Sequence, residues 1–419
     1  MKKCLSLFAS LFLLAVVGCF SEESFAQQAL TWREVRAKFE AVNPTLLAAR
    51  IGIDESRAQE ITAYLRPNPT FSLLVDQLHP NRVQSGALED SIQIATVGYL
   101  IERMNKRELR LESAQKGTAI ATSQLADLGR SLLFTLRTAF IQILQQKAIL
   151  ALAKENLAYY DRVLQLSGER FKAGDIAQID LDRLQLQRVT FESDLQTAEV
   201  NLRTSKIQLL TLLNDRTPVE QFDVTGPFEF PERILPLEEF RGMAMDARPD
   251  LKAAAQAVDK AQTDHQLAVA NGSTDPTFGV DLGRNPPIPA YIGFSVTIPL
   301  RIFDKNQGEK QRTELDIHRN ERLRDATQAQ VFSDVDSAYA MVNGNLNLLR
   351  PYKAKYLQLA AQVRETISYS YQHGGASLLD FLNAQNDYRS VQLNYLNLIG
   401  SYMTAASQLN LAVGREAIP

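Results

Sequence analysis

The chain has 419 residues, of which 45% are hydrophobic and 22% are charged, and its formal net charge is −3. The near balance of 45 basic and 48 acidic residues, without a long basic run, argues against a nucleic-acid-binding protein. The hydrophobic content excludes general disorder. Beyond the N-terminal leader no apolar run reaches the roughly 18 residues that a membrane-spanning helix needs.

The N-terminus has the pattern of an export signal, with a short basic start followed by an apolar stretch. Two cleavage sites remain open. In one, residues 1–18 are a lipoprotein leader and the lipidated Cys19 becomes the first mature residue. In the other, residues 1–26 are an ordinary signal peptide. Either way the chain leaves the cytoplasm. Cys4 is the only other cysteine, so the mature chain has no cysteine pair.

One sequence unit occurs twice in the chain. The segment from Phe171 to Asp180 recurs 200 residues later from Tyr371 to Asp380. A looser match pairs Asn43–Pro44 with Arg248–Pro249. We therefore divide the chain into a first repeat, a proline-rich linker, a second repeat and a short C-terminal tail: residues 27–214, 215–236, 237–414 and 415–419.

The sequence patterns of the two repeats predict the same helices and strands in the same order. A helix starts at a proline, in residues 44–65 and 249–271. A hairpin of two strands follows, with apolar residues at every second position, in residues 71–78 with 91–101 and 278–282 with 292–298. A very long helix is expected over residues 105–172, about 100 Å at 1.5 Å per residue. After a glycine turn a second helix returns to Asn214, and Pro351 predicts a kink or a break in the long helix of the second repeat.

The two strand hairpins of one chain cannot form a closed β-barrel by themselves. Four strands cannot close a barrel, because the smallest membrane barrels use about eight, and open strand edges are not tolerated in lipid. Three chains together would supply twelve strands and a tube of twelve helices. The alternative from the same spacing is a soluble half-buried sheet carried on an exported coiled-coil scaffold.

Several short motifs occur along the duplicated arrangement, in the order Ala29–Trp32, Asn43–Pro44, Pro67–Pro69, Asn105–Arg107 and Ile298–Glu309. Together with the duplication, these motifs resemble the TolC family of outer-membrane efflux proteins. The last motif is similar to a segment of the heavy-metal efflux branch of that family.

The resemblance implies a mainly α-helical chain that carries a membrane β-barrel part. Three identical chains would form a twelve-stranded β-barrel in the lipid of the outer membrane, joined to a twelve-helix α-barrel in the periplasm. This homotrimer would be a passive exit duct for metal cations or drugs. An inner-membrane RND-type transporter would deliver them through a periplasmic adaptor (membrane fusion) protein. No catalytic residue, cofactor, resident metal or nucleic-acid partner is expected. The alternative function is a periplasmic coiled-coil scaffold or adaptor.

The resemblance also implies a gate at the periplasmic end, formed by Asp380 and Asp180 together with Asn383 and Tyr371. The family has a second acidic residue where this chain has Asn383, and an arginine where it has Ala376, so the charge and locking of the gate are expected to differ. The competing interpretation of both aspartates is that they stabilise helix N-termini.

The two helix turns are expected to contact the adaptor through Gly174, Asp175, Gly374 and Gly375. The competing interpretation is simple reversal of the chain, which glycine serves without any partner.

Overall fold

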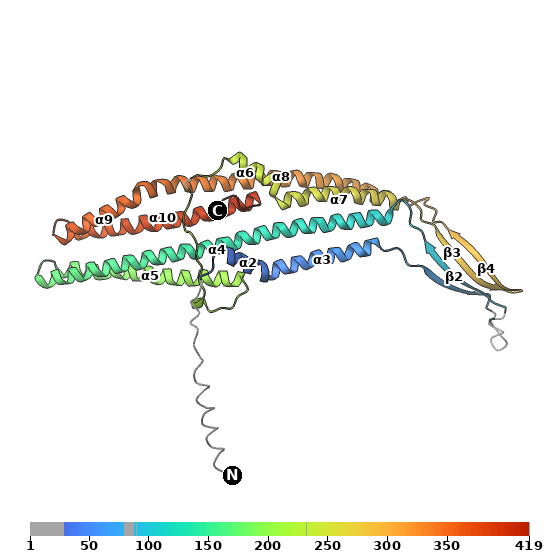
Figure 1. Cartoon of the computed structure of the whole chain (residues 1–419), viewed down its shortest axis with the longest axis horizontal. Helices are drawn as coiled ribbons and strands as arrows, with labels where there is room; N and C mark the ends of the chain where they lie inside the picture. The colour runs from blue at the N-terminus through green and yellow to red at the C-terminus, as the bar shows by residue number, and fades with distance from the viewer. Residues whose placement is uncertain (1–28, 79–87, 89, 232, 419) are drawn as a thin grey trace, which may run out of the picture.

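The structure, a computed structural model, describes residues 29–78, 88, 90–231 and 233–418. The molecule is long and narrow, with a β-sheet at one end and two helical turns at the other (Figure 1). Long helices run side by side between these ends, and the two short helices α2 and α6 lie near mid-length. The sheet and the helical turns are therefore separated by the full length of the helical part.

The element order of the first half recurs in the second half. The first half consists of α2 (Trp32–Val42), α3 (Pro44–Tyr64), β1 (Thr70–Asp76), β2 (Ile92–Leu100), α4 (Lys106–Ala173) and α5 (Gln178–Leu212). The second half consists of α6 (Leu237–Ala247), α7 (Pro249–Asn271), β3 (Thr277–Asn285), β4 (Ile288–Thr297), α8 (Gln307–Pro351), α9 (Leu357–Gln372) and α10 (Leu378–Val413). A short 3₁₀ helix, η2 (Val219–Gln221), lies between the halves.

The predicted helices are confirmed. Helices α3 and α7 begin at prolines, whose fixed φ suits a first turn. Helix α4 has 68 residues, about 100 Å at 1.5 Å per residue. The kink predicted at Pro351 takes the form of a π-helical segment, η3 (Tyr352–Tyr356), between α8 and α9. Proline has no backbone N–H to donate, and its ring clashes with the carbonyl of the residue four positions earlier. The regular α-helical hydrogen-bond pattern therefore changes there.

Helices α2 and α6 were not predicted. Helix α2 begins at a capping box in which Thr31 and Glu34 exchange hydrogen bonds. It buries Val35 and Phe39, which are spaced one turn apart. Helix α6 buries Phe240 and Ala244 with the same spacing. Because only two side chains of each helix are buried, the apolar period was too short to stand out in the sequence.

The four strands form one antiparallel sheet in the order β1-β2-β3-β4. Strand β2 of the first repeat pairs with β3 of the second, so the sheet joins the repeats. The register places Val97 opposite both Phe71 and Val280, and Val280 opposite Phe294. These four side chains make an apolar row across one face, as the period-two pattern predicts.

The opposite face of the sheet carries small and polar side chains. Thr96 lies opposite Ser72 and Asp281, and its hydroxyl donates a 2.7 Å hydrogen bond to the Asp281 carboxylate. A Cβ atom at Gly279 would lie 2.3 Å from the Ser295 hydroxyl oxygen. A larger residue at position 279 would therefore force the Ser295 side chain to move.

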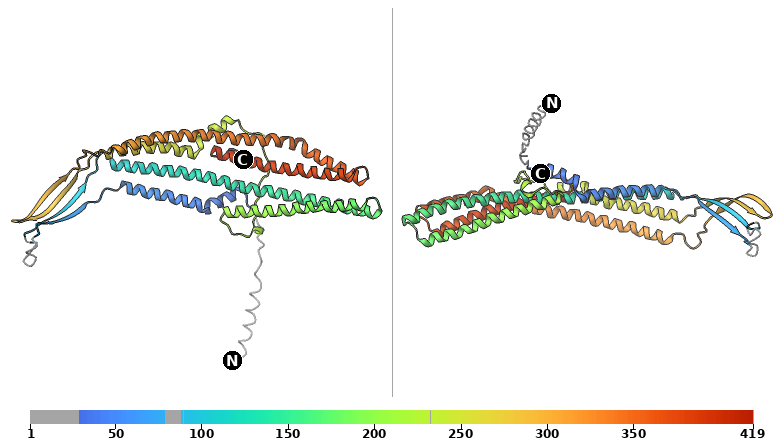
Figure 2. Two further views of the ribbon diagram at one scale, coloured as in Figure 1. Left: turned by 180° about the vertical axis from the view of Figure 1, so that it is seen from behind. Right: turned by 90° about the horizontal axis from the view of Figure 1, so that it is seen from below.

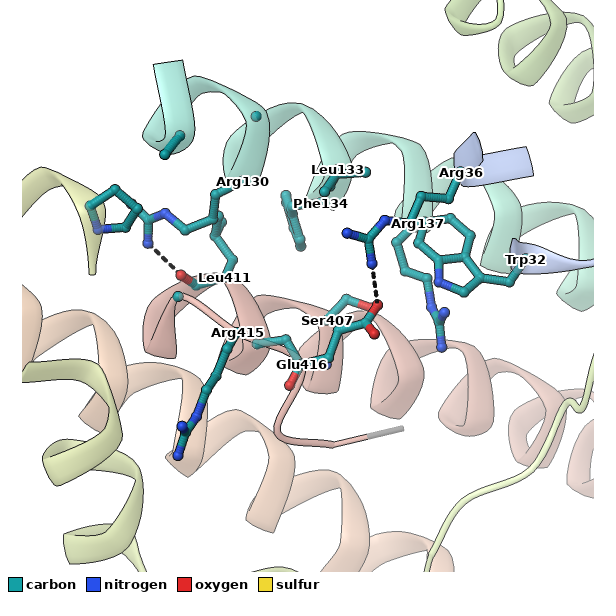
Figure 3. Close-up of a pocket in the computed structure, with 15 residues that line it drawn as sticks. Trp32, Arg36, Arg130, Leu133, Phe134, Arg137, Ser407, Leu411, Arg415 and Glu416 are labelled. Atoms are coloured by element: carbon teal, nitrogen blue, oxygen red, sulfur yellow. Dashed lines mark hydrogen bonds and ion pairs between the residues drawn. The ribbon is translucent and has the colours of Figure 1, made fainter. Parts of the chain in front are cut away.

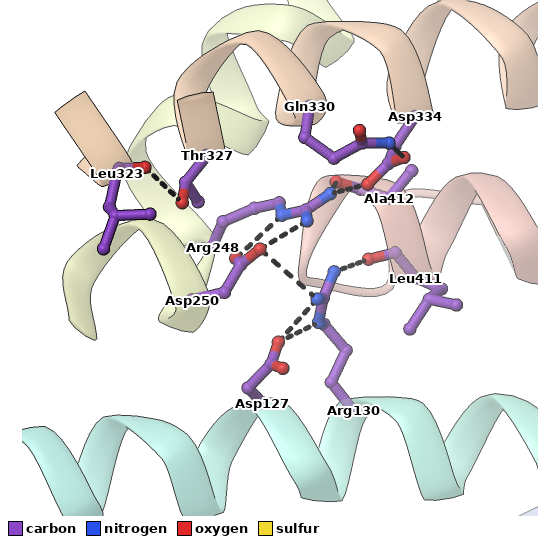
Figure 4. A network of polar contacts seen from close by, with 10 residues as sticks. All are labelled: Asp127, Arg130, Arg248, Asp250, Leu323, Thr327, Gln330, Asp334, Leu411 and Ala412. Carbon is purple, nitrogen blue, oxygen red and sulfur yellow. Dashed lines mark hydrogen bonds and ion pairs between the residues drawn. The ribbon is translucent and has the colours of Figure 1, made fainter. Parts of the chain in front are cut away.

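A buried arginine holds the second repeat together at mid-length (Figure 4). The Arg248 side chain is only 4% exposed and precedes the first proline of α7. Its guanidinium donates to Asp250 at 2.9 and 2.5 Å, to Asp334 of α8 at 2.8 Å and to the carbonyl of Ala412 in α10 at 3.1 Å. One side chain thus links α7, α8 and α10.

Candidate functional site: the helical tip and the open sheet

Two exposed turns form the end of the molecule that is farthest from the sheet (Figure 2). Gly174 ends α4 with φ +86°, and Gly374 lies between α9 and α10 with φ +76°. Both glycines have the left-handed conformation that other residues adopt at a cost, so they are required for reversal of the chain. Asp175 and Gly375 follow them and are also exposed. Contact of these four residues with an adaptor stays a prediction.

A buried cluster just behind the turns packs the two helical hairpins together. Tyr160 of α4 lies 4.7 Å from the ring centroid of Phe191 in α5 and 6.4 Å from that of Phe381 in α10. The cluster draws on both repeats, and its buried members are Tyr160, Val163, Leu184, Phe191, Tyr371, Leu378 and Phe381. The tip is therefore a packed unit within one chain.

Tyr371 is part of this cluster. Its ring stacks on Phe381 at 5.0 Å with an interplanar angle of 20°. Burial raises the pKa of the Tyr371 hydroxyl, and the negative charge of Asp180 acts in the same direction. The structure thus brings two of the four predicted gate residues, Tyr371 and Asp180, near one another across the hairpins.

Asp380 is the last residue of a capping box at the start of α10. Its carboxylate accepts hydrogen bonds from the Ser377 hydroxyl at 2.7 Å and from the Ser377 amide at 3.3 Å. The Ser377 hydroxyl in turn accepts from the Asp380 amide at 3.1 Å. Asp180 has no such box, because Ala177 occupies the N-cap of α5. Asn383 is exposed one turn beyond Asp380.

Three further residues at the tip were missed by the sequence analysis. Arg170, near the end of α4, donates a 2.9 Å hydrogen bond to the carbonyl of Tyr371, and its guanidinium lies 5.6 Å from the centroid of that ring. The hydroxyl of Tyr159 donates a 2.7 Å hydrogen bond to that of Ser368 in α9. These contacts join residues about 200 apart. The duplication is the one sequence signal that points to the Arg170 contact, because Arg170 directly precedes Phe171, the repeat counterpart of Tyr371.

Arg364 is a second unexpected arginine between the hairpins. Its guanidinium is buried and stacks over the rings of Tyr388 at 3.6 Å and Tyr159 at 4.7 Å. Cation–π contacts of this kind stabilise a positive charge that is removed from water. Arg364 therefore packs α9 against α4 and α10.

The apolar face of the sheet is exposed to an unusual degree for a folded chain. Phe294 is 83% exposed and Phe71 is 71% exposed, and these two residues are the ends of the apolar row described above. A contiguous apolar surface of this kind marks a region that another molecule or a membrane covers. Within the described residues, β1 and β4 are the edges of the sheet.

Neither metal ligation nor helical membrane crossing is supported by the part of the chain that the structure describes. Within residues 29–78, 90–231 and 233–418, no group of three or more histidine, cysteine, aspartate or glutamate side chains could hold a metal ion. None of the described helices is long and apolar enough to span a bilayer. Cys19 and both predicted cleavage sites lie outside the described residues.

The sequence matches the "Outer membrane efflux protein" family over residues 36–215 and 241–415. It is 24% identical over 384 residues to the cobalt-zinc-cadmium resistance protein CzcC of Cupriavidus metallidurans, covering 89% of this chain and 87% of that protein. It is 21% identical over 434 residues to the outer membrane protein TolC of Vibrio cholerae, covering 99% of this chain and 96% of that protein.

Solved structures share the fold. The crystal structure of CusC superposes with a TM-score of 0.76 at 16% identity and covers 92% of both chains. The open state of the MtrE outer membrane channel of Neisseria gonorrhoeae superposes with a TM-score of 0.74 at 16% identity and covers 92% of this chain and 89% of that one. The long helices and the terminal sheet are thus arranged as in these channels.

Proposed function

The chain belongs to the outer membrane efflux protein family and is an outer-membrane duct of a tripartite efflux system, and we propose that three copies of it enclose the conduit. The observation that carries this proposal is the open four-stranded sheet with one exposed apolar face. A strand edge in lipid leaves backbone groups unpaired at a cost of several kcal/mol each, so the edges must be closed by other strands. Three sheets supply twelve strands, within the range of membrane barrels.

The trimer is tested on protein extracted from outer membranes in a mild detergent. We expect a particle whose protein mass is three times that of the mature chain, resistant to dissociation on unheated gels, with its sheet protected from protease. Recovery of a monomer that retains the folded sheet would contradict the proposal. Release of the protein by a salt wash of the periplasm would contradict membrane insertion itself.

We further propose that the helical tip is the gate and that the exposed turns at Gly174 and Gly374 meet a periplasmic adaptor. Three-fold symmetry would bring three Asp380 carboxylates around one axis. Carboxylates at short range repel one another, attract cations and favour cation passage. The hydrogen bonds from Ser377 are compatible with this role, since the capping carboxylate of Asp380 is still exposed.

Asp380→Ala tests the acidic gate. In planar bilayers the variant is expected to lose part of its cation preference, because three charges leave the constriction. Ser377→Ala is the matched control, because it breaks the same capping box but keeps the carboxylate. We expect both variants to lose about 1 kcal/mol of helix stability. Only Asp380→Ala should change selectivity. Equal cation preference in Asp380→Ala and the wild type would exclude Asp380 from the gate.

The cargo proposed for this duct is a metal cation or a drug-like solute. The similarity to a cobalt-zinc-cadmium resistance protein favours metal cations. The duct itself would be passive. Energy and most selectivity would come from an inner-membrane RND-type transporter that feeds the duct through the adaptor.

A further inference from the structure

A pocket of about 490 Å³ lies at mid-length of the molecule, between α2, α4 and the C-terminal end of the chain (Figure 3). Four arginines line it: Arg36, Arg130, Arg137 and Arg415. Glu416 is the single carboxylate among the lining residues. The volume falls within the usual range for small-molecule sites, about 300–1,000 Å³.

Two of the four arginines have partners within the chain. Arg130 donates to the Asp127 carboxylate at 3.0 and 2.5 Å and also to the carbonyl of Leu411. Arg36 donates to Glu40 at 2.8 Å and lies 3.7 Å from Glu416. The positive charges of these two side chains are therefore balanced by the protein itself.

Arg137 is different. Within the part of the chain that the structure describes, its guanidinium has no hydrogen bond or ion pair and lies 4.5 Å from the Trp32 ring centroid. Burial lowers the pKa of Arg137, and Glu416 offsets this only in part. An arginine nevertheless stays charged in proteins. A half-buried charge without a hydrogen-bonded counterion is unfavourable, so this donor group is suited to an anion that enters the pocket.

The remaining walls of the pocket are largely apolar. Leu133 and Phe134 of α4 and Leu411 of α10 contribute side chains beside the guanidinium groups. A ligand that satisfies both features carries an anionic head and an apolar body. Arg415, which is exposed at the rim, adds a second positive charge for the head.

The position of the pocket argues against a lipid of the membrane. Arg137 lies 31 residues after the start of α4 at Lys106, so about 45 Å of helix separates it from the end of α4 that adjoins the sheet. The head group of a lipid in a bilayer around the sheet does not reach the pocket over this distance. A soluble molecule in the periplasmic space can reach it.

We propose that this pocket binds a soluble amphiphilic anion, with a phosphate or carboxylate head on Arg137 and Arg415 and an apolar body against Leu133, Phe134 and Leu411. All the lining residues belong to one chain, so the proposal needs no residue of a neighbouring copy and does not use the gate. Trp32 stacks on Arg137 and is the only tryptophan of the chain. Its fluorescence therefore reports occupancy of this pocket.

The test uses the full mature chain in nanodiscs of zwitterionic lipid, titrated with octyl phosphate below its micelle concentration. We expect a saturable change in Trp32 emission. Inorganic phosphate has only the head and octanol only the apolar body, so each should bind at least about tenfold more weakly. A wild-type protein without a saturable response to octyl phosphate would overturn the proposal.

Variants distinguish binding in the pocket from general attraction of the anion to surface charge. Arg137→Gln is expected to weaken octyl phosphate binding by about tenfold or more, and Arg137→Lys, which keeps the charge but not the planar donors, by less. Arg203→Gln is the control, since Arg203 is exposed on α5 and pairs with Glu220 at 2.8 Å. Equal affinity in Arg137→Gln and the wild type would exclude Arg137 as the anion site. If Arg137→Gln does not fold, the affinity of Arg137→Lys for octyl phosphate is the deciding measurement.

A last arm distinguishes the source of the anion. In nanodiscs that contain phosphatidylglycerol and no octyl phosphate, Trp32 emission is expected to match that in zwitterionic lipid. A change caused by the anionic lipid alone, abolished by Arg137→Gln, would assign the pocket to a membrane head group and overturn the soluble ligand.

Discussion

Replacement of Leu73 by arginine is expected to prevent stable assembly in the outer membrane. Leu73 lies in the middle of β1, opposite Ala95, on the exposed apolar face of the sheet. An arginine at mid-membrane depth on a lipid-facing barrel surface costs about 2–4 kcal/mol. In a trimer the cost is incurred three times. The measurement is the amount of heat-resistant trimer in outer-membrane fractions, at equal total expression.

Ser72→Arg is the matched control for Leu73→Arg. Ser72 adjoins Leu73 in the same strand, but its side chain points to the opposite, polar face, because successive side chains of a strand alternate. The same charge added one residue away should therefore leave assembly close to normal. Equal loss of trimer in both variants would show that the apolar face does not meet lipid.

Replacement of Arg248 by alanine is expected to destabilise the helical part by about 3–5 kcal/mol. The cost is large because Asp334 would lose its arginine partner in a half-buried site and Asp250 would keep only Arg130, 3.9 Å away. The carbonyl of Ala412 would also lose a hydrogen bond. Urea unfolding of the detergent-solubilised protein, followed by circular dichroism, measures the difference.

Arg241→Ala is the control for Arg248→Ala. Arg241 also pairs with an aspartate of α8, Asp336, but the side chains of this pair are 30% and 40% exposed. Solvent screens such a pair, so its removal should destabilise the protein much less than Arg248→Ala does. Similar destabilisation by both variants would show that burial does not set the strength of the Arg248 network.

The Arg248 network also predicts a dependence of stability on pH. Burial by itself would raise the pKa of Asp250, but the hydrogen bonds and charge of Arg248 outweigh it, so the net shift is downward. A carboxyl whose folded pKa is depressed stabilises the fold above its unfolded pKa of about 3.9, and this contribution is lost as the pH falls through the folded pKa. We expect Arg248→Ala to reduce the loss of stability as the pH falls below about 4.

The helices and strands could be predicted because their signals are local. Proline at positions 44 and 249, glycine at 174 and the alternation around Val280 each act within a few residues. The capping alternative for Asp380 was equally local, since Ser377 lies three residues away. Helices α2 and α6 escaped prediction because each buries only two side chains, too few to establish a period.

The sequence by itself determined the duplicated unit, the length of α4 and the one-sided apolar sheet, since these depend on periodicity along a single segment. Only the tertiary structure decided that β2 pairs with β3, that Arg170 bonds to Tyr371 and that Arg137 faces a pocket where, among the described residues, no carboxylate is hydrogen-bonded to it. Each of these depends on segments more than 100 residues apart. Their relative placement follows from packing of whole helices, and no local pattern encodes which charged side chain will meet a partner and which will face open space.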